Sequence, residues 1–419
     1  MRLSQASLLL CGCGLSSIAA AATFSDVLES QQAQPYEVQI VDCRDSNFYN
    51  GWPEMGQATG GHIPGAVNFD ARWVEMMSAD ELKHMIENKS LVKDHPTFLY
   101  CAMDSATQLK KTLVKQGFQS VDVIEQPLEQ YQGDLVALPR YQNLVPAWWV
   151  NDVIKGETVQ HAPSADYKVL EVAWGPATKY LWAHIPGAQY VNTNDIESKP
   201  WWNRVSDEQL EVLVHNLGIK YDTTVILYGR ENMAAARLAN ILMYAGVQDV
   251  RLLNGGWQSW EDGGYQTAMT SPEVSATTAF GKTIPANPNY IIDLPEAKAL
   301  LTLPQDQQSL VSIRTLAEFN GETSGYDYIQ SKGHIPGAKW GHAGSDAYHL
   351  EDFRNPDQTM RSAEEITQFW HAANIEPEQQ VSFFCGTGWR ASEVFFYAYV
   401  MGWENISVYD GGWYQWAGK

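Results

Sequence analysis

Cysteine is scarce in this chain of 419 residues, which holds five, and basic residues are outnumbered by acidic ones. Lysine and arginine number 28 against 49 aspartates and glutamates, giving a formal net charge of −21. No basic stretch is interleaved with aromatic residues, so nucleic acid is a poor candidate partner. After the amino-terminal region no segment approaches about 18 uninterrupted apolar residues, so no membrane span is expected. A site for a small anion therefore has to be built locally, from backbone amides and a few cations.

Composition and length indicate a globular protein with several domains. Hydrophobic residues make up 45% of the chain and charged residues 18%, which excludes intrinsic disorder. At roughly 150 residues per domain, the length predicts about three folded units.

The amino terminus, residues 1–22, has the pattern of a secretory signal peptide: an arginine, an apolar run and a stretch of small residues. Cleavage is expected after Ala21 or Ala22, with export to the periplasm; the alternative is a frayed tail on a cytoplasmic protein. Cleavage would leave Cys43, Cys101 and Cys385. An odd number of cysteines in an exported protein implies at least one free or reactive thiol.

One element is repeated three times. The string HIPGA begins at His62, His184 and His334. A strand-like run, a short turn and a helix-like segment follow each copy, which predicts a parallel sheet flanked by helices in each unit, an α/β fold. Because the three histidines belong to separate copies of one turn, we expect them to be hydrogen-bonded turn residues rather than metal ligands.

Polar, proline-containing stretches separate the copies. We therefore expect three tandem domains, at residues 23–145, 160–268 and 286–419.

The copies differ at the turn between strand and helix, where Cys101, Gly229 and Cys385 align. The second copy lacks a nucleophile. In the first, no glycine or arginine follows the cysteine closely, and Asp104 would oppose a thiolate. We expect both copies to be degenerate and structural, and only the third to be catalytic.

The turn after Cys385 has the composition of an anion cradle. Its glycines allow a tight turn that directs N–H groups toward the sulfur, and the helix beginning directly afterwards adds its positive end. Charge-assisted hydrogen bonds contribute roughly 1.5–3 kcal/mol each, which favours the thiolate and makes Cys385 a nucleophile. The alternative is a buried structural cysteine. The predicted cradle consists of Gly386, Thr387, Gly388, Trp389 and Arg390.

These features resemble the rhodaneses, a family of sulfurtransferases, over essentially the whole chain after residue 22. The GHIPGA element at 333–338, the six-residue loop at 385–390 and the DGGW turn at 410–413 match motifs of that family in order. The resemblance implies three tandem rhodanese-like domains and a persulfide on Cys385. It implies no metal and no organic cofactor.

The resemblance also implies a reaction. Cys385 would take sulfur from a small anionic donor and pass it to cyanide, a small thiol or a protein thiol, with ping-pong kinetics. We expect thiosulfate as the donor, whereas Gly386 and Thr387 are closer to the branch that uses 3-mercaptopyruvate. A phosphatase is disfavoured, because phosphatase loops place one more residue between the cysteine and the arginine. A non-catalytic sulfur carrier or interaction protein is a further alternative.

The third copy departs from the family pattern at the end of its first strand. The first strand of the family ends in Asp-x-Arg, as residues 42–44 do, but the third copy has Ser312 before Arg314. We expect Arg314 to be a second cation near the substrate; the alternative is a strand-end residue paired with a surface acid.

Cys43 and Cys101 follow strands that this fold places side by side, so we hypothesise a disulfide between them.

Overall fold

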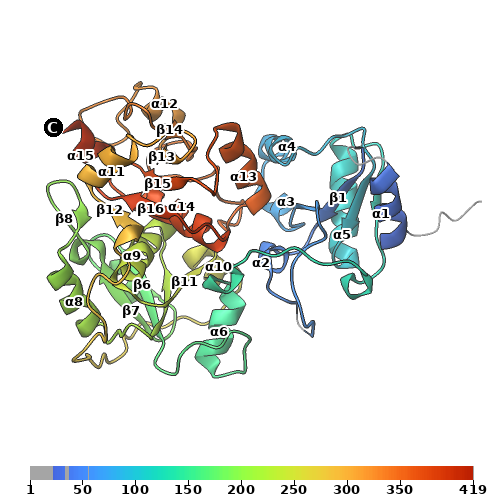
Figure 1. Ribbon diagram of the computed structural model, residues 1–419. Coiled ribbons are helices and arrows are strands. Elements are labelled where there is room, and N and C mark those ends of the chain that lie inside the picture. Colours follow the sequence, from blue (N-terminus) through green and yellow to red (C-terminus); the bar gives the residue numbers. More distant parts are fainter. Residues whose placement is uncertain (1–21, 34–36, 55, 419) are drawn as a thin grey trace, which may run out of the picture.

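The computed structural model describes residues 22–33, 37–54 and 56–418 (Figure 1). Apart from Ala22, the predicted signal peptide lies outside these residues. Across the described ranges, none of the helices combines the length and the apolar character that crossing a bilayer requires.

The first unit holds a four-stranded parallel sheet in the order β2-β1-β3-β4. The central strands β1 and β3 carry the buried apolar residues that pack against the helices. Its strands are β1 (Gln39–Asp42), β2 (Val67–Asn68), β3 (Thr97–Tyr100) and β4 (Val121–Val123). Its helices are α1 (Phe24–Ala33), α2 (Ser46–Asn50), α3 (Trp73–Met76), α4 (Ala79–Asn88) and α5 (Met103–Lys115).

The second unit holds a five-stranded parallel sheet in the order β5-β11-β10-β6-β7 and a small antiparallel pair, β8 with β9. Strand β5 pairs with β11, so it belongs to this sheet although its residues lie within 23–145. The strands are β5 (Leu144–Val145), β6 (Lys168–Ala173), β7 (Ala188–Asn192), β8 (Glu197–Ser198), β9 (Asn203–Arg204), β10 (Thr224–Tyr228) and β11 (Asp249–Leu253). The helices are α6 (Ala147–Lys155), α7 (Thr178–Trp182), α8 (Asp207–Asn216), α9 (Asn232–Ala245) and α10 (Gly256–Asp262).

The third unit repeats this plan, with a parallel sheet in the order β12-β16-β15-β13-β14. The strands are β12 (Ile291–Ile292), β13 (Gln308–Ser312), β14 (Lys339–Trp340), β15 (Gln380–Phe384) and β16 (Ile406–Tyr409). The helices are α11 (Leu294–Leu300), α12 (Leu316–Phe319), α13 (Ala363–Ala372), α14 (Trp389–Val400) and α15 (Gly412–Ala417). Short 3₁₀ turns lie at η1 (Leu128–Gln130), η2 (Tyr141–Asn143), η3 (Thr193–Asp195) and η4 (Pro288–Tyr290). The predicted α/β class, with three tandem parallel sheets flanked by helices, is confirmed.

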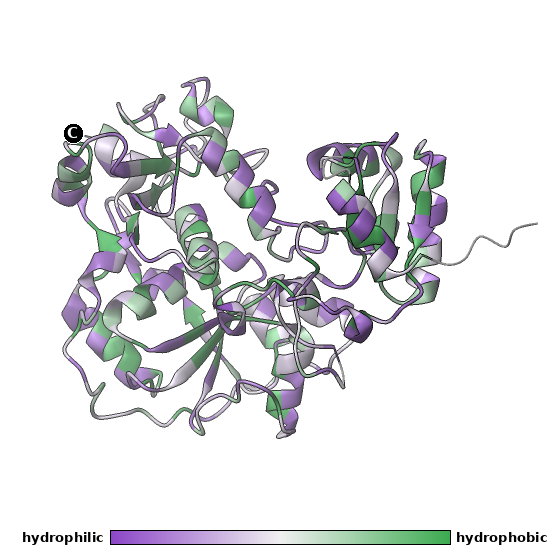
Figure 2. Ribbon diagram, turned by 45° about the vertical axis from the view of Figure 1, so that its right-hand side comes forward, coloured by the Kyte–Doolittle hydropathy of each residue, from purple (hydrophilic) through white to green (hydrophobic). Residues whose placement is uncertain are grey.

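The second and third units share one hydrophobic core, whereas the first stands to one side (Figure 1). Helices α9 and α14 pack against each other between the two sheets, and every residue of α9 is buried. Hydrophobic residues follow the central strands, and hydrophilic residues occupy much of the outer helices (Figure 2). The candidate site at the start of α14 therefore lies beside a neighbouring unit rather than in an isolated domain.

Helix starts illustrate how the sequence determines these elements. Ser78 with Glu81 and Ser206 with Gln209 form complete capping boxes. At α13 the serine caps the helix in the same way, but the carboxylate of Glu365 binds Lys89 of the first unit at 2.7 Å. A local helix signal there also serves an interdomain contact.

Candidate active site

Cys385 lies at the carboxyl end of the central strand β15, directly before α14, and is fully buried. The N–H of Gly388 donates to its Sγ at 3.1 Å. Gly388 has a φ of +151°, a conformation that side chains rarely adopt. Within the described residues, the amides of the other four cradle residues meet no hydrogen-bond acceptor. The sulfur thus accepts one N–H of the loop, and four further N–H donors of the loop have no acceptor among the described residues.

The DGGW turn at residues 410–413, together with Tyr414, holds this loop through two backbone hydrogen bonds. The N–H of Trp413 donates to the carbonyl of Cys385 at 2.9 Å, and the N–H of Tyr414 donates to the carbonyl of Gly386 at 3.0 Å. Gly412 has a φ of +53°, and a Cβ there would lie 2.7 Å from both carbonyl oxygens. The glycine is required because the turn and the loop approach so closely.

The guanidinium of Arg390 holds the shape of the loop rather than reaching a solvent-facing substrate. Its two terminal nitrogens donate to the carboxylate of Glu318 at 2.8 and 2.9 Å, and both residues are fully buried. Burial alone would lower the pKa of Arg390, but Tyr326 and Glu318 outweigh it and the pKa is raised. The predicted arginine thus lies in the loop, with its charge balanced by an acid that sequence analysis did not identify.

Arg314 lacks such a partner. Its Nη2 donates to the carbonyl of Gly333 at 2.7 Å and its Nε to the hydroxyl of Ser312 at 3.2 Å, while its buried Nη1 has no partner among the described residues. Burial lowers the pKa of Arg314 to about 10, although Glu318 opposes the shift. Arg314 is therefore still a cation at neutral pH.

The second unit reaches into the loop of the third. The indole N–H of Trp389 donates to Glu197 at 2.8 Å, and Nε of Arg237 donates to the same carboxylate at 2.8 Å. Arg237 also pairs with Asp410 of the DGGW turn. Burial raises the pKa of Glu197, and the two donors oppose this shift only in part. A Cβ on Gly388 would lie 3.2 Å from the Arg237 guanidinium, so the neighbouring unit lies against the cradle itself.

Aromatic residues close the other side of the cradle. The ring of Tyr326 lies so near Gly386 that a Cβ there would approach it to 2.4 Å. Tyr326 stacks on Tyr328 with ring centroids 5.2 Å apart. Burial raises the pKa of both tyrosines, so both phenols are neutral donors at physiological pH.

The equivalent positions of the other copies are engaged differently. Cys101 forms a disulfide with Cys43, as hypothesised, with their Cα atoms 5.2 Å apart. In the second unit Gly229 occupies the position, and Arg230 binds Glu171 at 3.2 Å. One feature is common to all three: an arginine donates to the carbonyl before the HIPGA histidine. The arginines are Arg44, Arg230 and Arg314.

The three HIPGA histidines are turn residues. Nδ1 of each lies 2.7–3.0 Å from a backbone carbonyl of a residue earlier in the chain. Their rings stack on an aromatic residue in each case. The histidines are His62, His184 and His334.

Sequence analysis missed the two tyrosines beside the loop and three charged residues of this site. Glu318 had a signal, because Thr315 and Glu318 form a capping box. Arg237 is the one charged residue in a largely apolar helical segment, a pattern that indicates a buried charge with a partner. Glu197 has no local signal, since it lies 192 residues from Trp389 in sequence.

Comparison with known proteins agrees with this geometry. The rhodanese-like domain model matches residues 21–134, 157–262 and 294–419. The thiosulfate sulfurtransferase YnjE of Escherichia coli is 48% identical over 418 residues, covering 99% of this chain and 95% of that protein. The sulfur carrier protein TtuD of Thermus thermophilus is 31% identical over 61% of this chain and 90% of its own length.

Solved structures give the same result. The crystal structure of YnjE superposes with a TM-score of 0.90 and covers 95% of this chain and 94% of that one. EanB, in a complex with ergothioneine, has a TM-score of 0.89 and 36% identity, covering 95% of this chain and 97% of its own. The chain belongs to the rhodanese family. The predicted family and the predicted sulfurtransferase class of enzyme are thereby confirmed.

Proposed function

We propose that the protein moves sulfane sulfur from thiosulfate, through a persulfide on Cys385, to cyanide or a thiol. One observation carries the proposal: the buried sulfur accepts the Gly388 N–H at 3.1 Å while the remaining amides of the loop have no acceptor among the described residues. Such amides suit a second, negatively charged sulfur atom attached to Cys385. The loop of residues 385–390 is the proposed cradle, and the third unit is the proposed catalytic domain.

The reaction has two halves. The Cys385 thiolate attacks the outer sulfur of thiosulfate, the S–S bond of the donor breaks, and sulfite leaves with the electron pair. The acceptor thiolate or cyanide then attacks the outer sulfur of the persulfide, and Cys385 leaves as a thiolate. No net oxidation of the protein occurs, and the kinetics are ping-pong.

Arg314 supplies the positive charge for the anionic donor in this proposal. Each of the two arginines has one buried nitrogen without a hydrogen-bond partner among the described residues, but the charge of Arg390 is balanced by Glu318, whereas Arg314 forms no ion pair within those residues. A cation in a site shielded from water interacts more strongly with an anion than one in solvent does. Arg390 then keeps the loop in shape, and its backbone N–H belongs to the cradle.

The relatives support persulfide chemistry but leave the donor open. One EanB structure is described as holding ergothioneine covalently linked to a persulfide cysteine. An Arabidopsis thaliana relative, 27% identical over 60% of this chain and 80% of its own length, is named as a thiosulfate/3-mercaptopyruvate sulfurtransferase. We keep 3-mercaptopyruvate as the alternative donor and sulfur carriage without turnover as the alternative role.

We also propose that the protein is exported to the periplasm after removal of residues 1–22. A disulfide between Cys43 and Cys101 supports an oxidising compartment. The first two units would then be degenerate as sulfur acceptors, with the second supplying Glu197 and Arg237 to the loop.

The test is intact-mass measurement after incubation with thiosulfate or with 3-mercaptopyruvate. Wild type should gain one sulfur atom and lose it on addition of cyanide, while Cys385→Ser should gain none. Release of phosphate from p-nitrophenyl phosphate, with no sulfur gained from either donor, would contradict the proposal. A gain of sulfur that is not passed on to cyanide or to thiols would favour the alternative role, sulfur carriage without turnover.

A further inference from the structure

The disulfide of the first unit lies where the third unit has its nucleophile. Cys101 follows β3 and precedes α5, as Cys385 follows β15 and precedes α14. Strand β3 lies beside β1 as β15 lies beside β13, so the two positions correspond in the sheets. The bond therefore lies at the carboxyl end of the sheet, at the position that holds the proposed nucleophile in the third unit.

A cavity of about 360 Å³ opens at this position, and both cysteines line it. The two sulfur atoms differ in access. Cys43 is only 2% exposed and packs in the hydrophobic core of the unit, whereas Cys101 is half-buried and the residues after it are exposed. A small nucleophile entering the cavity therefore reaches Cys101 first, and Cys43 is the leaving group.

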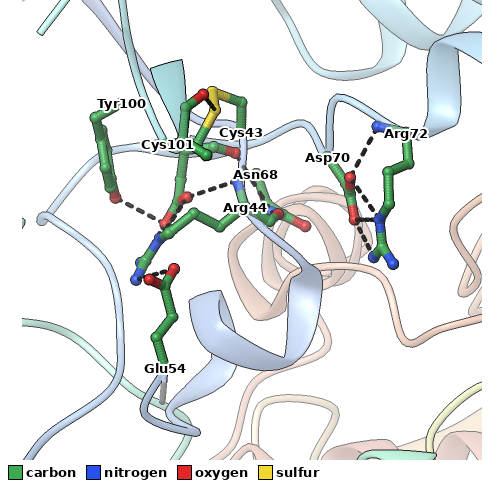
Figure 3. The surroundings of a disulfide bond; sticks show 10 residues. Cys43, Arg44, Glu54, Asn68, Asp70, Arg72, Tyr100 and Cys101 are labelled. Atoms are coloured by element: carbon green, nitrogen blue, oxygen red, sulfur yellow. Dashed lines mark hydrogen bonds and ion pairs between the residues drawn. A yellow bond between two sulfur atoms is a disulfide. The ribbon is translucent and has the colours of Figure 1, made fainter. Parts of the chain in front are cut away.

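Charged residues surround the bond on several sides (Figure 3). Each cavity arginine is already paired with carboxylates: Arg44 with Asp42 at 2.6 Å, and Arg72 with Asp45 at 2.6 Å and with Asp70. The carboxylates that line the cavity outnumber its two arginines and are Asp45, Glu54, Asp70 and Glu129. The cavity is therefore unfavourable for an anion and favourable for a neutral or cationic molecule.

We propose that this cavity is a thiol–disulfide exchange site for small thiols, with a preference for thiols that carry an amine. The thiolate attacks Sγ of Cys101, a new S–S bond forms, the bond to Cys43 breaks, and Cys43 leaves as a thiolate that takes a proton from water. A second thiol attacks the mixed disulfide, giving a free disulfide and reduced Cys101. Two thiols are oxidised and one protein disulfide is reduced, and the sequence is reversible.

This site is independent of the proposed sulfur transfer, because Cys385 takes no part. It is tested in the chain without residues 1–22 and with Cys385→Ser, so that Cys43 and Cys101 are the remaining cysteines and the disulfide stays intact. The folded protein is incubated with cysteamine, 2-mercaptoethanol or mercaptoacetate, acid-quenched, alkylated and measured by intact mass. Each rate constant is calculated per thiolate and divided by the rate constant for the reaction of the same thiol with hydroxyethyl disulfide. This division removes the differences in intrinsic reactivity between the thiols.

Exchange is expected under native conditions, with cysteamine at least about fivefold faster than mercaptoacetate after this correction. Glu129→Gln should lower the ratio of the cysteamine rate to the mercaptoacetate rate. Glu157 is exposed and does not line the cavity, so Glu157→Gln should leave this ratio unchanged. A disulfide that resists all three thiols until denaturant is added would overturn the exchange site. Equal corrected rates for the three thiols would overturn the charge preference.

The attacked sulfur is identified by trapping. In the chain without residues 1–22 and with Cys385→Ser, Cys43→Ala leaves Cys101 as the single thiol, and Cys101→Ala leaves Cys43. Cystamine should label the first variant at least about tenfold faster, because only Cys101 has access to solvent. Circular dichroism first confirms that each variant is folded. Faster labelling of Cys43 would contradict the assignment of Cys101 as the entry sulfur.

Discussion

A single indole couples the proposed catalytic loop to the neighbouring unit. Trp389 donates to the buried carboxylate of Glu197 at 2.8 Å, a charge-assisted bond of a kind that contributes roughly 1.5–3 kcal/mol. Trp389→Phe keeps an aromatic ring and removes the donor, so the loop loses one anchor. We expect kcat/KM for sulfur transfer to fall about tenfold with the fold intact. Trp182→Phe is the matched control, because that indole is 76% exposed; equal effects of the two substitutions would contradict the coupling.

Ser312 leaves Arg314 without an ion pair at this position, and the proposed role of Arg314 in binding the donor depends on that. In the first unit Asp42 occupies this position and binds Arg44 through two nitrogens, at 2.9 and 2.6 Å. Ser312→Asp should rebuild that pair around Arg314, raise its pKa above the present value of about 10 and neutralise its charge.

The expected result of Ser312→Asp is a decrease of about tenfold in kcat/KM for thiosulfate, mainly through KM. Ser312→Asn is the uncharged control and should stay within about twofold of wild type. Steady-state kinetics with thiosulfate measure both variants. Full activity of the aspartate variant would exclude Arg314 as the cation that receives the donor.

The element that matters most for the proposed chemistry is the turn between β15 and α14. Gly388 combines a φ of +151°, the hydrogen bond to Sγ, and a contact distance of 3.2 Å between a built Cβ and Arg237. Gly388→Ala adds backbone strain of about 1–3 kcal/mol and presses on the arginine. Persulfide formation should slow at least about a hundredfold, because the amide that faces Sγ is displaced.

Gly264→Ala is the control for backbone strain. Gly264 has a φ of +64° and open space around a built Cβ, so the same substitution costs strain without touching the loop. Urea unfolding should show destabilisation of both variants, larger for Gly388→Ala, and stopped-flow sulfur transfer should be slowed only by Gly388→Ala. A Gly388→Ala variant that forms persulfide at the wild-type rate would remove the main support for the cradle.

At the scale of elements, the sequence was informative wherever a signal is local. The HIPGA repeats, the capping serines and the strand-turn-helix step at Cys385 each depend on a few neighbouring residues, and the structure contains those elements. Glu197 and Arg237 could not be placed at the loop, because their contact with residues 388–389 arises only when α9 packs on α14. Their role depends on the arrangement of whole units, which no local pattern encodes.

At the scale of the whole molecule, polar contacts join the first unit to the third. Lys89 of the first unit is buried and binds Glu365 at 2.7 Å, and the indole of Trp73 donates to Asp357 at 2.8 Å. Burial lowers the pKa of Lys89, although Glu365 opposes the shift. Removing one member of such a pair is strongly destabilising, because the remaining charge stays buried without a partner.

Glu365→Gln should therefore weaken the contact between the first and third units and lower the free energy of unfolding by about 3 kcal/mol. The double variant Lys89→Met with Glu365→Gln should recover much of that loss, since no buried charge is then left alone. Limited proteolysis and urea unfolding, followed at the first transition, measure both variants. A double variant less stable than Glu365→Gln alone would show that the charge pair is not what joins the units.

The same pair makes the junction sensitive to acid. Burial acts to raise the pKa of Glu365, but Lys89 and Arg361 outweigh it and the pKa is lowered. A carboxyl whose folded pKa is lowered contributes stability above its ordinary value of about 4.3, and this contribution is lost as the pH falls through the folded pKa. Wild type should therefore lose stability more steeply than Glu365→Gln below about pH 4.5, so that the difference between them shrinks. Parallel pH profiles of the unfolding free energy would mean that Glu365 does not carry the charge that anchors the first unit.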